Sequence, residues 1–347
     1  MNASKKSTAT DLGYWEPGEL ENADRCLACG SSDAAVLHNG LDDLLGSVPG
    51  KWGFNQCRAC GTLHLDPRPT EAAIHKVYPD NYVTHQEGKK AHLRDNGTSF
   101  FWEACNAYLN HRFGTKRQPA NERLAWLVKC IPPVRLQLDY FYRHLPRKPG
   151  RLLDVGAGNG AFLLRAREAG WQVQGLEPDS RAVLAAQSEG IDVVHGSIST
   201  FHVDAEFDQV CLSHVLEHLH DPTGALVRIF GWLKPGGRVW LALPNPTGLG
   251  SRIFAENWFA LDPPRHLVIP PQAELRRILE KAGFVDVQIV RRGRGSRSSI
   301  APSFVYARTR GRSTWFGAGV LAGVIDVLST LHPMFGEESV VTARRPQ

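Results

Sequence analysis

The sequence predicts an α/β fold, with a doubly wound and mostly parallel sheet in the second half of the chain. From Arg151 onward, short apolar runs alternate with amphipathic helical stretches, which is the pattern of a parallel sheet covered by helices on both faces. The first apolar run ends in a glycine-rich turn, Asp-Val-Gly-Ala-Gly-Asn-Gly over residues 154–160. Such a turn suits a nucleotide, because backbone N–H groups at a helix start approach a ligand closely only where no Cβ intervenes.

The expected elements follow in chain order. Strands are expected at residues 152–155, 172–176, 192–195, 208–212, 238–243 and 285–290, with a closing strand from residue 338. Helices are expected at residues 161–169, 180–189, 222–233 and 272–282. Ligands of a doubly wound sheet bind outside the carboxyl ends of its strands, so functional residues are expected there.

The chain has 347 residues, which favours more than one domain, and its 42% apolar and 22% charged content is that of an ordinary globular protein. No apolar signal segment follows Met1, so we expect a cytoplasmic location. The predicted divisions are a disordered tail (1–22), a cysteine-rich module (23–66), a helical linker or lid (67–150) and the α/β domain (151–347) with an insert (292–337).

Four of the seven cysteines form two Cys-x-x-Cys pairs, and each pair is followed by a glycine. Two such turns bring four thiolates to the corners of a tetrahedron, so the pairs predict a zinc ribbon with a closed, structural Zn²⁺ site. The predicted ligands are Cys26, Cys29, Cys57 and Cys60. A ribbon that binds nucleic acid is the competing interpretation, but residues 21–66 carry more acidic than basic side chains.

Two carboxylates favour a nucleoside ligand with an amino group and a sulfonium cation over a dinucleotide with a pyrophosphate. Glu177 ends the second expected strand, where a carboxylate accepts hydrogen bonds from ribose hydroxyls. Asp154 precedes the first glycine by two residues, and its charge suits an amino group and a sulfonium cation better than a pyrophosphate. The glycines also fit the dinucleotide pattern of NAD-dependent dehydrogenases, but no domain for a nicotinamide substrate is evident.

A later Leu-Lys-Pro-Gly-Gly turn (233–237) leads into the strand that ends at Pro244. With these features, residues 151–284 resemble the class I S-adenosylmethionine (SAM) dependent methyltransferases. The resemblance implies a Rossmann-like seven-stranded sheet of order 3-2-1-4-5-7-6, in which the last strand is antiparallel. It also implies SAM as cofactor, with contacts from Asp154, Gly156, Ala157, Gly158, Glu177, Pro178, Ser197, Ser213 and His214.

Two further segments carry candidate catalytic residues. The run from His214 to Pro222 resembles a stretch of ubiquinone-pathway-like methyltransferases, and the run from Trp258 to His266 resembles the substrate loop of polysaccharide-associated ones. His266 is the leading general base, since a pKa near neutral suits the removal of a hydroxyl proton, and His214 is the second candidate. For Glu217 and His218 a structural hydrogen bond is favoured.

The cysteine module and the linker after it resemble those of deoxysugar C-methyltransferases. The predicted substrate contacts are Arg265, which would steer an anionic group such as a sugar diphosphate, together with Asn245, Tyr78 and Tyr82. The expected function is therefore O-methylation, or else C-methylation, of a small sugar-containing intermediate. Two alternatives remain: RNA or protein methylation, with the ribbon and an arginine-rich segment (291–312) as docking surface, and a non-catalytic SAM-binding scaffold.

The apolar segment 315–331 contains Asp326 and several glycines and is too short for a comfortable membrane span. We expect a helix packed against the protein; a weak contact with a membrane surface, aided by the arginines before it, is the alternative.

Overall fold

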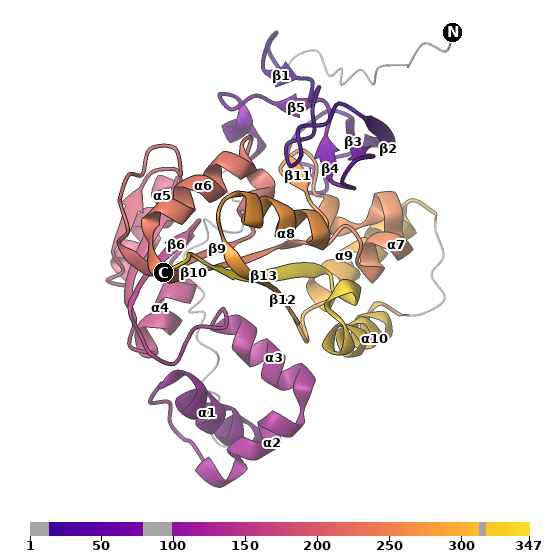
Figure 1. Ribbon diagram of the computed structural model, residues 1–347. Coiled ribbons are helices and arrows are strands. Elements are labelled where there is room, and N and C mark those ends of the chain that lie inside the picture. Colours follow the sequence, from indigo (N-terminus) through magenta and orange to yellow (C-terminus); the bar gives the residue numbers. More distant parts are fainter. Residues whose placement is uncertain (1–13, 79–98, 312–316) are drawn as a thin grey trace.

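The computed structural model describes residues 14–78, 99–311 and 317–347, and its centre is a seven-stranded sheet (Figure 1). Its order is β12-β13-β10-β9-β6-β7-β8, with β13 antiparallel to both neighbours and the other pairs parallel. This is the predicted order 3-2-1-4-5-7-6, which is confirmed. The strands are β6 (Arg151–Val155), β7 (Gln172–Glu177), β8 (Val193–His195), β9 (Phe207–Ser213), β10 (Leu233–Pro244), β12 (Val285–Val290) and β13 (Glu338–Arg344).

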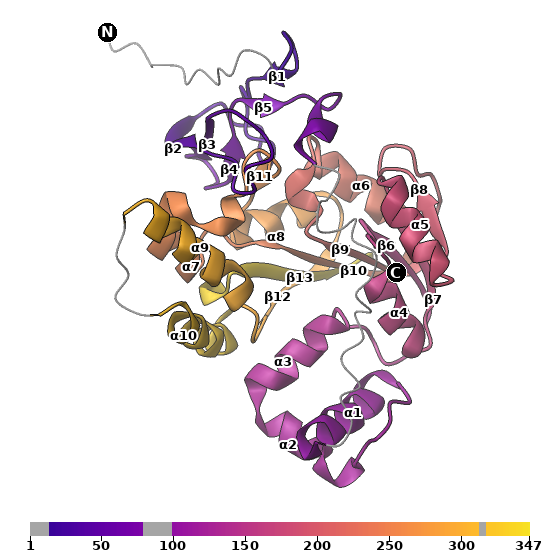
Figure 2. The ribbon, with the colours of Figure 1, turned by 180° about the vertical axis from the view of Figure 1, so that it is seen from behind.

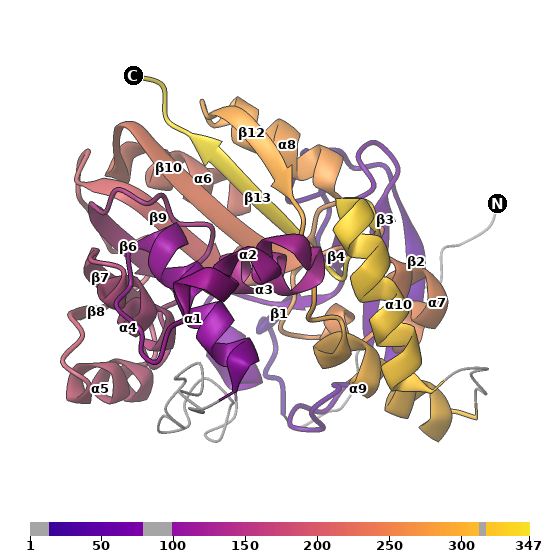
Figure 3. The same ribbon diagram turned by 90° about the horizontal axis from the view of Figure 1, so that it is seen from below.

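Helices cover both faces of this sheet because its strands are apolar on both sides. Leu241 and Leu243 of β10 belong to a core shared with α6 (Pro222–Trp232) and α8 (Gln272–Lys281). Trp240 and Ala242 belong to a core on the other face. That face is covered by α1 (Phe100–Phe113), α2 (Ala125–Cys130), α3 (Pro132–Phe141) and α4 (Ala161–Glu168), with α5 (Ser180–Ser188) beside them. Figure 3 shows α1, α2 and α3 in front of the sheet.

The cysteine-rich module is a second, antiparallel sheet of order β11-β4-β3-β2. Its strands are β2 (Ala34–Leu41), β3 (Trp52–Cys57), β4 (Leu63–Leu65) and β11 (Val268–Ile269). The fourth strand therefore comes from the α/β domain, immediately after the predicted substrate loop. Figures 1 and 2 show this module on the side of the main sheet opposite to α1–α3.

The ordered part of the chain begins earlier than predicted. β1 (Leu20–Glu21) pairs with β5 (Arg68–Pro69), and the Tyr14 hydroxyl donates a hydrogen bond to the Lys76 carbonyl at 2.8 Å. The predicted disordered tail is thus wrong for residues 14–22, whereas residues 1–13 lie outside the described range.

The insert between β12 and β13 supports the cysteine-rich module. Ile300 and Ala307 of α9 (Arg297–Thr309) and Ile325 of α10 (Ala318–Leu331) share a core with Trp52 and Phe54 of β3. α7 (Leu249–Phe254) joins the same core. The remaining short 3₁₀ helices are η1 (Ile74–Val77), η3 (Glu122–Leu124), η4 (Leu216–His218), η5 (Ala255–Asn257), η6 (Phe259–Leu261) and η7 (Pro333–Phe335). Among the described helices, none combines the length and the hydropathy that crossing a bilayer requires.

Candidate functional site

The glycine turn after β6 is joined to the end of β7. Gly156, Gly158 and Gly160 all have positive φ, and a Cβ on Gly156 would lie 2.6 Å from a Val215 methyl group. The Glu177 carboxylate accepts a hydrogen bond from the Gly158 N–H at 2.8 Å. The structure therefore brings Glu177, the carboxylate predicted to bind ribose, next to the predicted glycine turn. Ala157 lies within this turn and Pro178 directly follows Glu177.

Asp154 is more deeply placed than its predicted role requires. Its side chain is only 1% exposed and forms an ion pair with the Arg143 guanidinium. Burial raises the pKa of Asp154 to about 6, although the charge of Arg143 opposes this shift. Its Oδ2 atom is buried and has no hydrogen-bond partner among the described residues. The sequence predicted that this carboxylate faces the ligand as an unpaired charge, whereas it is paired with Arg143. One of its oxygens, Oδ2, still lacks a partner among the described residues and could accept from an amino group.

The other predicted cofactor contacts lie at the same edge of the sheet. Ser213 is the last residue of β9, and Ser197 follows β8 with its hydroxyl 2.8 Å from that of Ser199. The residues predicted to contact SAM at the ends of β6, β7, β8 and β9 therefore lie along one edge of the sheet.

His214 follows β9 with φ at +54° and lies between two carboxylates. Its Nδ1 is 3.1 Å from Glu217 Oε1 and its Nε2 is 3.5 Å from Glu338 Oε1. Desolvation by the surrounding protein disfavours the charged ring, but the hydrogen bonds to Glu217 and Glu338 outweigh it and raise the pKa of His214 to about 10. His214 is therefore an imidazolium at neutral pH, which suits a contact to the cofactor or acceptor and not proton removal.

A cluster of polar side chains adjoins His214: Glu217, His218, His266 and Tyr78. Glu217 is fully buried, and its Oε1 lies 4.0 Å from His266 Nε2. The rings of His218 and His266 meet edge to face, with centroids 4.7 Å apart. The Tyr78 hydroxyl is 3.2 Å from His218 Nδ1, so the predicted contact from the linker tyrosine does reach this cluster. Tyr82 lies outside the described residues.

Backbone carbonyls fix the tautomers of both histidines. His218 Nδ1 is 3.0 Å from the Arg265 carbonyl oxygen, and His266 Nδ1 is 2.9 Å from that of Ala260. A carbonyl only accepts hydrogen bonds, so in the neutral form of either ring Nδ1 carries the proton and Nε2 keeps its lone pair. Burial and the neighbouring His266 lower the pKa of His218 to about 4, so this ring is neutral but weakly basic.

Glu217 has a larger part than the sequence indicated. Burial opposes its ionisation, but the hydrogen bond from His214 holds the pKa of Glu217 below its ordinary value. It is an ionised carboxylate between two histidines, and its Oε2 has no hydrogen-bond partner among the described residues. The only sequence signal for this role was the spacing of His214, Glu217 and His218.

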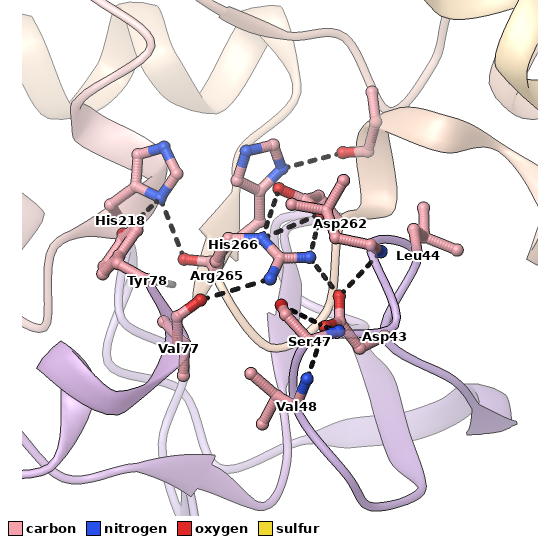
Figure 4. A network of polar contacts seen from close by, with 12 residues as sticks. Asp43, Leu44, Ser47, Val48, Val77, Tyr78, His218, Asp262, Arg265 and His266 are labelled. Carbon is pink, nitrogen blue, oxygen red and sulfur yellow. Dashed lines mark hydrogen bonds and ion pairs between the residues drawn. The ribbon is translucent and has the colours of Figure 1, made fainter. Parts of the chain in front are cut away.

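Arg265 does not face a substrate, which corrects its predicted role. Its side chain is fully buried and donates to Asp43 of the cysteine-rich module, to Asp262 and to the Val77 carbonyl (Figure 4). The charge of the Arg265 guanidinium is neutralised by two carboxylates, so it does not attract a diphosphate. Its backbone carbonyl positions His218, so Arg265 is a positioning residue.

The side chain of Asn245 also forms its hydrogen bonds within the protein. It is fully buried, and its side-chain N–H groups donate to the carbonyls of Met334 at 3.2 Å and Gly336 at 2.9 Å. Its oxygen accepts from Thr247. Asn245 therefore fixes the loop after β10 to the insert instead of presenting its amide to an acceptor molecule, which corrects the prediction.

The four predicted zinc ligands converge. Cys26 and Cys60 have their sulfur atoms 3.7 Å apart, and those of Cys29 and Cys57 are 3.5 Å apart. A tetrahedral zinc with bonds of about 2.3 Å separates its sulfurs by roughly 3.8 Å, so the cluster has the size that zinc requires. Gly30 and Gly61 have φ of +80° and +76°, and each donates its N–H to the carbonyl of the first cysteine of its pair. The donor set fits a closed Zn²⁺ site.

Residues 134–289 match the sequence model of a family described as "Methyltransferase domain". This range includes β6–β10, all of β12 except its last residue, and the ends of β6–β9 described above. The domain built on the seven-stranded sheet is a class I SAM-dependent methyltransferase domain. The cysteine-rich module, apart from β11, and the insert with α9 and α10 lie outside the matched range.

The methyltransferase domain has curated relatives of low similarity. The "Ubiquinone biosynthesis O-methyltransferase" of Xanthomonas oryzae pv. oryzae is 32% identical over 134 residues, which are 35% of this chain and 53% of that protein. The protein of the same name from Nitrosococcus oceani is 31% identical over 120 residues, 32% of this chain and 51% of the relative. The chain thus spans about half the length of the curated relatives that it matches.

Solved structures of methyltransferases also resemble the chain. A SAM dependent methyltransferase from Archaeoglobus fulgidus has 23% identity and a TM-score of 0.42, and the match covers 65% of this chain and 100% of that one. The fold assignment rests on the strand order of the protein itself.

Proposed function

We propose that the protein is a SAM-dependent methyltransferase that methylates a hydroxyl group of a small, sugar-containing acceptor. The observation that carries this proposal is the position of His266, whose Nδ1 is 2.9 Å from the Ala260 carbonyl oxygen and whose Nε2 is 4.0 Å from the buried Glu217 carboxylate. Methyl transfer to a hydroxyl needs alignment of donor and acceptor and a base for one proton, and this cluster supplies the base.

The residues at the edge of the sheet would bind different parts of SAM. Glu177 would accept hydrogen bonds from the ribose hydroxyls, and the free oxygen of Asp154 would accept from the amino group. SAM, when bound, supplies the methyl group on a sulfonium. His214, as an imidazolium, would donate a hydrogen bond to the cofactor or acceptor without taking part in proton removal.

His266 would accept the hydroxyl proton at Nε2. The ionised Glu217 carboxylate, 4.0 Å away, would stabilise the imidazolium that forms. Tyr78 and His218 would line the same cluster and hold the acceptor hydroxyl towards His266. Proton removal by a positioned base contributes about 10²- to 10⁴-fold to a rate, so His266 should be visible in the kinetics.

The sugar-containing acceptor is supported by the resemblance of the loop 258–266 and of the zinc module to enzymes of carbohydrate pathways. Because Arg265 is buried in ion pairs, it does not steer an anionic group of the acceptor. Cytoplasmic action on a small molecule, and not on nucleic acid, is part of the proposal.

Calorimetric titration with SAM tests the cofactor, using the wild-type protein, Glu177→Ala and Asp154→Ala. We expect Glu177→Ala to weaken SAM binding at least about tenfold, because two charge-assisted hydrogen bonds to ribose are lost. Unchanged affinity in both variants would remove the basis of the proposal.

Release of S-adenosylhomocysteine with a panel of nucleotide-activated sugars and deoxysugars tests the reaction. His266→Gln should lose at least about a hundredfold in rate and keep its affinity for SAM. The exposed His202→Gln is the matched control. Product formation with RNA alone would instead favour nucleic-acid methylation, and SAM binding without turnover on any panel member would favour a scaffold.

A further inference from the structure

Helix α10 has a bare apolar face. Val320, Val324, Val327 and Leu331 are 62%, 49%, 55% and 65% exposed, and their spacing of four, three and four residues places them on one side of the helix. We call these four residues the α10 stripe. The opposite side of α10 packs into the protein through Ala322 and Ile325. A helix that needs only to cover a core would carry polar side chains on its outer face, and this one does not.

Two unpaired arginines border the α10 stripe. Arg294 and Arg297 line an open hollow of about 390 Å³ together with Gln137 of α3 and, from α10, Gly319, Ala322, Gly323, Asp326 and Val327. Within residues 14–78, 99–311 and 317–347, neither guanidinium forms a hydrogen bond or ion pair. By contrast, Arg292 is paired with Glu338, and Arg310 with Asp42.

The one acidic residue of the hollow is already engaged. Asp326 Oδ1 accepts hydrogen bonds from the N–H groups of Gly295 at 3.1 Å and Ser296 at 2.9 Å. It therefore holds the segment that carries Arg294 in place and does not form an ion pair with the arginine side chains. The hollow keeps a net positive charge beside an apolar ridge.

An anionic bilayer matches both features at once. The interface of such a bilayer offers acyl chains to apolar side chains and phosphate groups to arginines at nearly the same depth. A second copy of the chain fits less well, because a two-fold interface through α10 would bring the two positive hollows together.

We propose that α10 docks the protein onto an anionic phospholipid membrane, with the α10 stripe inserted at the acyl boundary and Arg294 and Arg297 on lipid phosphates. This inference does not depend on the proposed methyl-transfer reaction. It gives the insert between β12 and β13 a second role besides supporting the zinc module: it holds the methyltransferase site at a membrane surface, where a lipid-carried acceptor would be found.

Co-sedimentation of the full chain with vesicles tests the proposal. We expect binding to phosphatidylcholine vesicles that contain phosphatidylglycerol, weaker binding as salt rises, and little binding to phosphatidylcholine alone. Arg294→Gln with Arg297→Gln should lower the partition coefficient roughly 30-fold, since each arginine near an anionic surface contributes a factor of about five.

The stripe is tested by Val324→Gln with Val327→Gln, which should reduce binding at least about tenfold because both apolar insertions are lost. The matched control is Leu184→Gln with Val227→Gln, two side chains that are 66% and 57% exposed on α5 and α6. Circular dichroism would verify that each variant is folded. Equal binding by stripe and control variants, or no binding to anionic vesicles, would overturn the proposal. A dimer in sedimentation velocity that is lost in the stripe variant would assign this face to a second copy.

Discussion

At neutral pH, one of two neighbouring histidines in the site is positively charged and the other is neutral. His214 is protonated because Glu217 and Glu338 raise its pKa to about 10 against desolvation, and His218 is neutral because burial and His266 lower its pKa to about 4. Neither ring changes charge near neutral pH. A pH dependence of activity in that range would therefore report on a group other than these two rings.

The charge of His214 predicts a pH-dependent stability. A folded pKa above the unfolded value means that the stabilisation is fully present below about pH 6.5 and is lost as the pH rises towards 10. His214→Gln should therefore reduce the free energy of unfolding near pH 6 by about 1 kcal/mol, a small effect because the side chain is 41% exposed and solvent screens it. Urea unfolding of the two proteins should give the same stability near pH 10.

The control for His214 is His202→Gln, because His202 is also exposed but lies outside the site. This substitution should leave stability unchanged at both pH values. A His214→Gln deficit that grows as the pH rises would contradict the assigned charge state.

At the scale of elements, two loops that are far apart in sequence hold each other. The Asp43 carboxylate accepts hydrogen bonds from the N–H groups of Ser47 and Val48, both at 2.8 Å, and from Leu45 at 3.0 Å. This loop presents the carboxylate to Arg265, whose backbone carbonyl fixes the His218 tautomer. The cysteine-rich module therefore helps to position the cluster of Glu217, His218 and His266 without contributing a side chain to it.

Asp43→Asn should destabilise the protein by about 1–3 kcal/mol, since the buried Arg265 guanidinium loses one of its two carboxylate partners and keeps only Asp262. It should also release the tautomer of His218, which ¹⁵N NMR of the imidazole nitrogens would detect. Asp42→Asn is the matched control one residue away: the Asp42 side chain is 51% exposed, and its surface ion pairs with Lys51 and Arg310 should contribute at most about 1 kcal/mol. Equal losses in urea unfolding for the two variants, with an unchanged His218 spectrum, would show that Asp43 has no positioning role.

At the scale of the whole molecule, the parts that the sequence predicted are those set by local patterns. Strand alternation, the glycine turn and the paired cysteines each depend on residues close together in the chain, and all three are found. The errors concern long-range pairs: Arg265 was predicted to meet substrate, but its partner Asp43 lies 222 residues away. The short β11 was missed for the same reason, because only its pairing with β4 makes it a strand.

The cysteine-rich module and the methyltransferase domain share a sheet, so we expect loss of a bound zinc ion to loosen the loop that leads into β11. Leu65 N–H donates to the Leu267 carbonyl at 3.0 Å, and Leu267 N–H donates to the Glu217 carbonyl at 2.7 Å, which links β4 to the site in two steps. Zinc analysis should find one ion per wild-type chain and none in Cys60→Ser, because structural zinc sites contribute directly to folding.

Hydrogen exchange should then lose protection in Cys60→Ser at residues 262–269, whereas residues 151–160, in β6 and the glycine turn, should keep theirs, because their hydrogen bonds run to β7 and β9. The exposed, unpaired Cys130 provides the control, since Cys130→Ser should retain both zinc and protection. If residues 262–269 stayed protected after zinc loss, β11 and the Asp43–Arg265 pair would be independent of the metal, and the zinc module would be only an appendage of the domain.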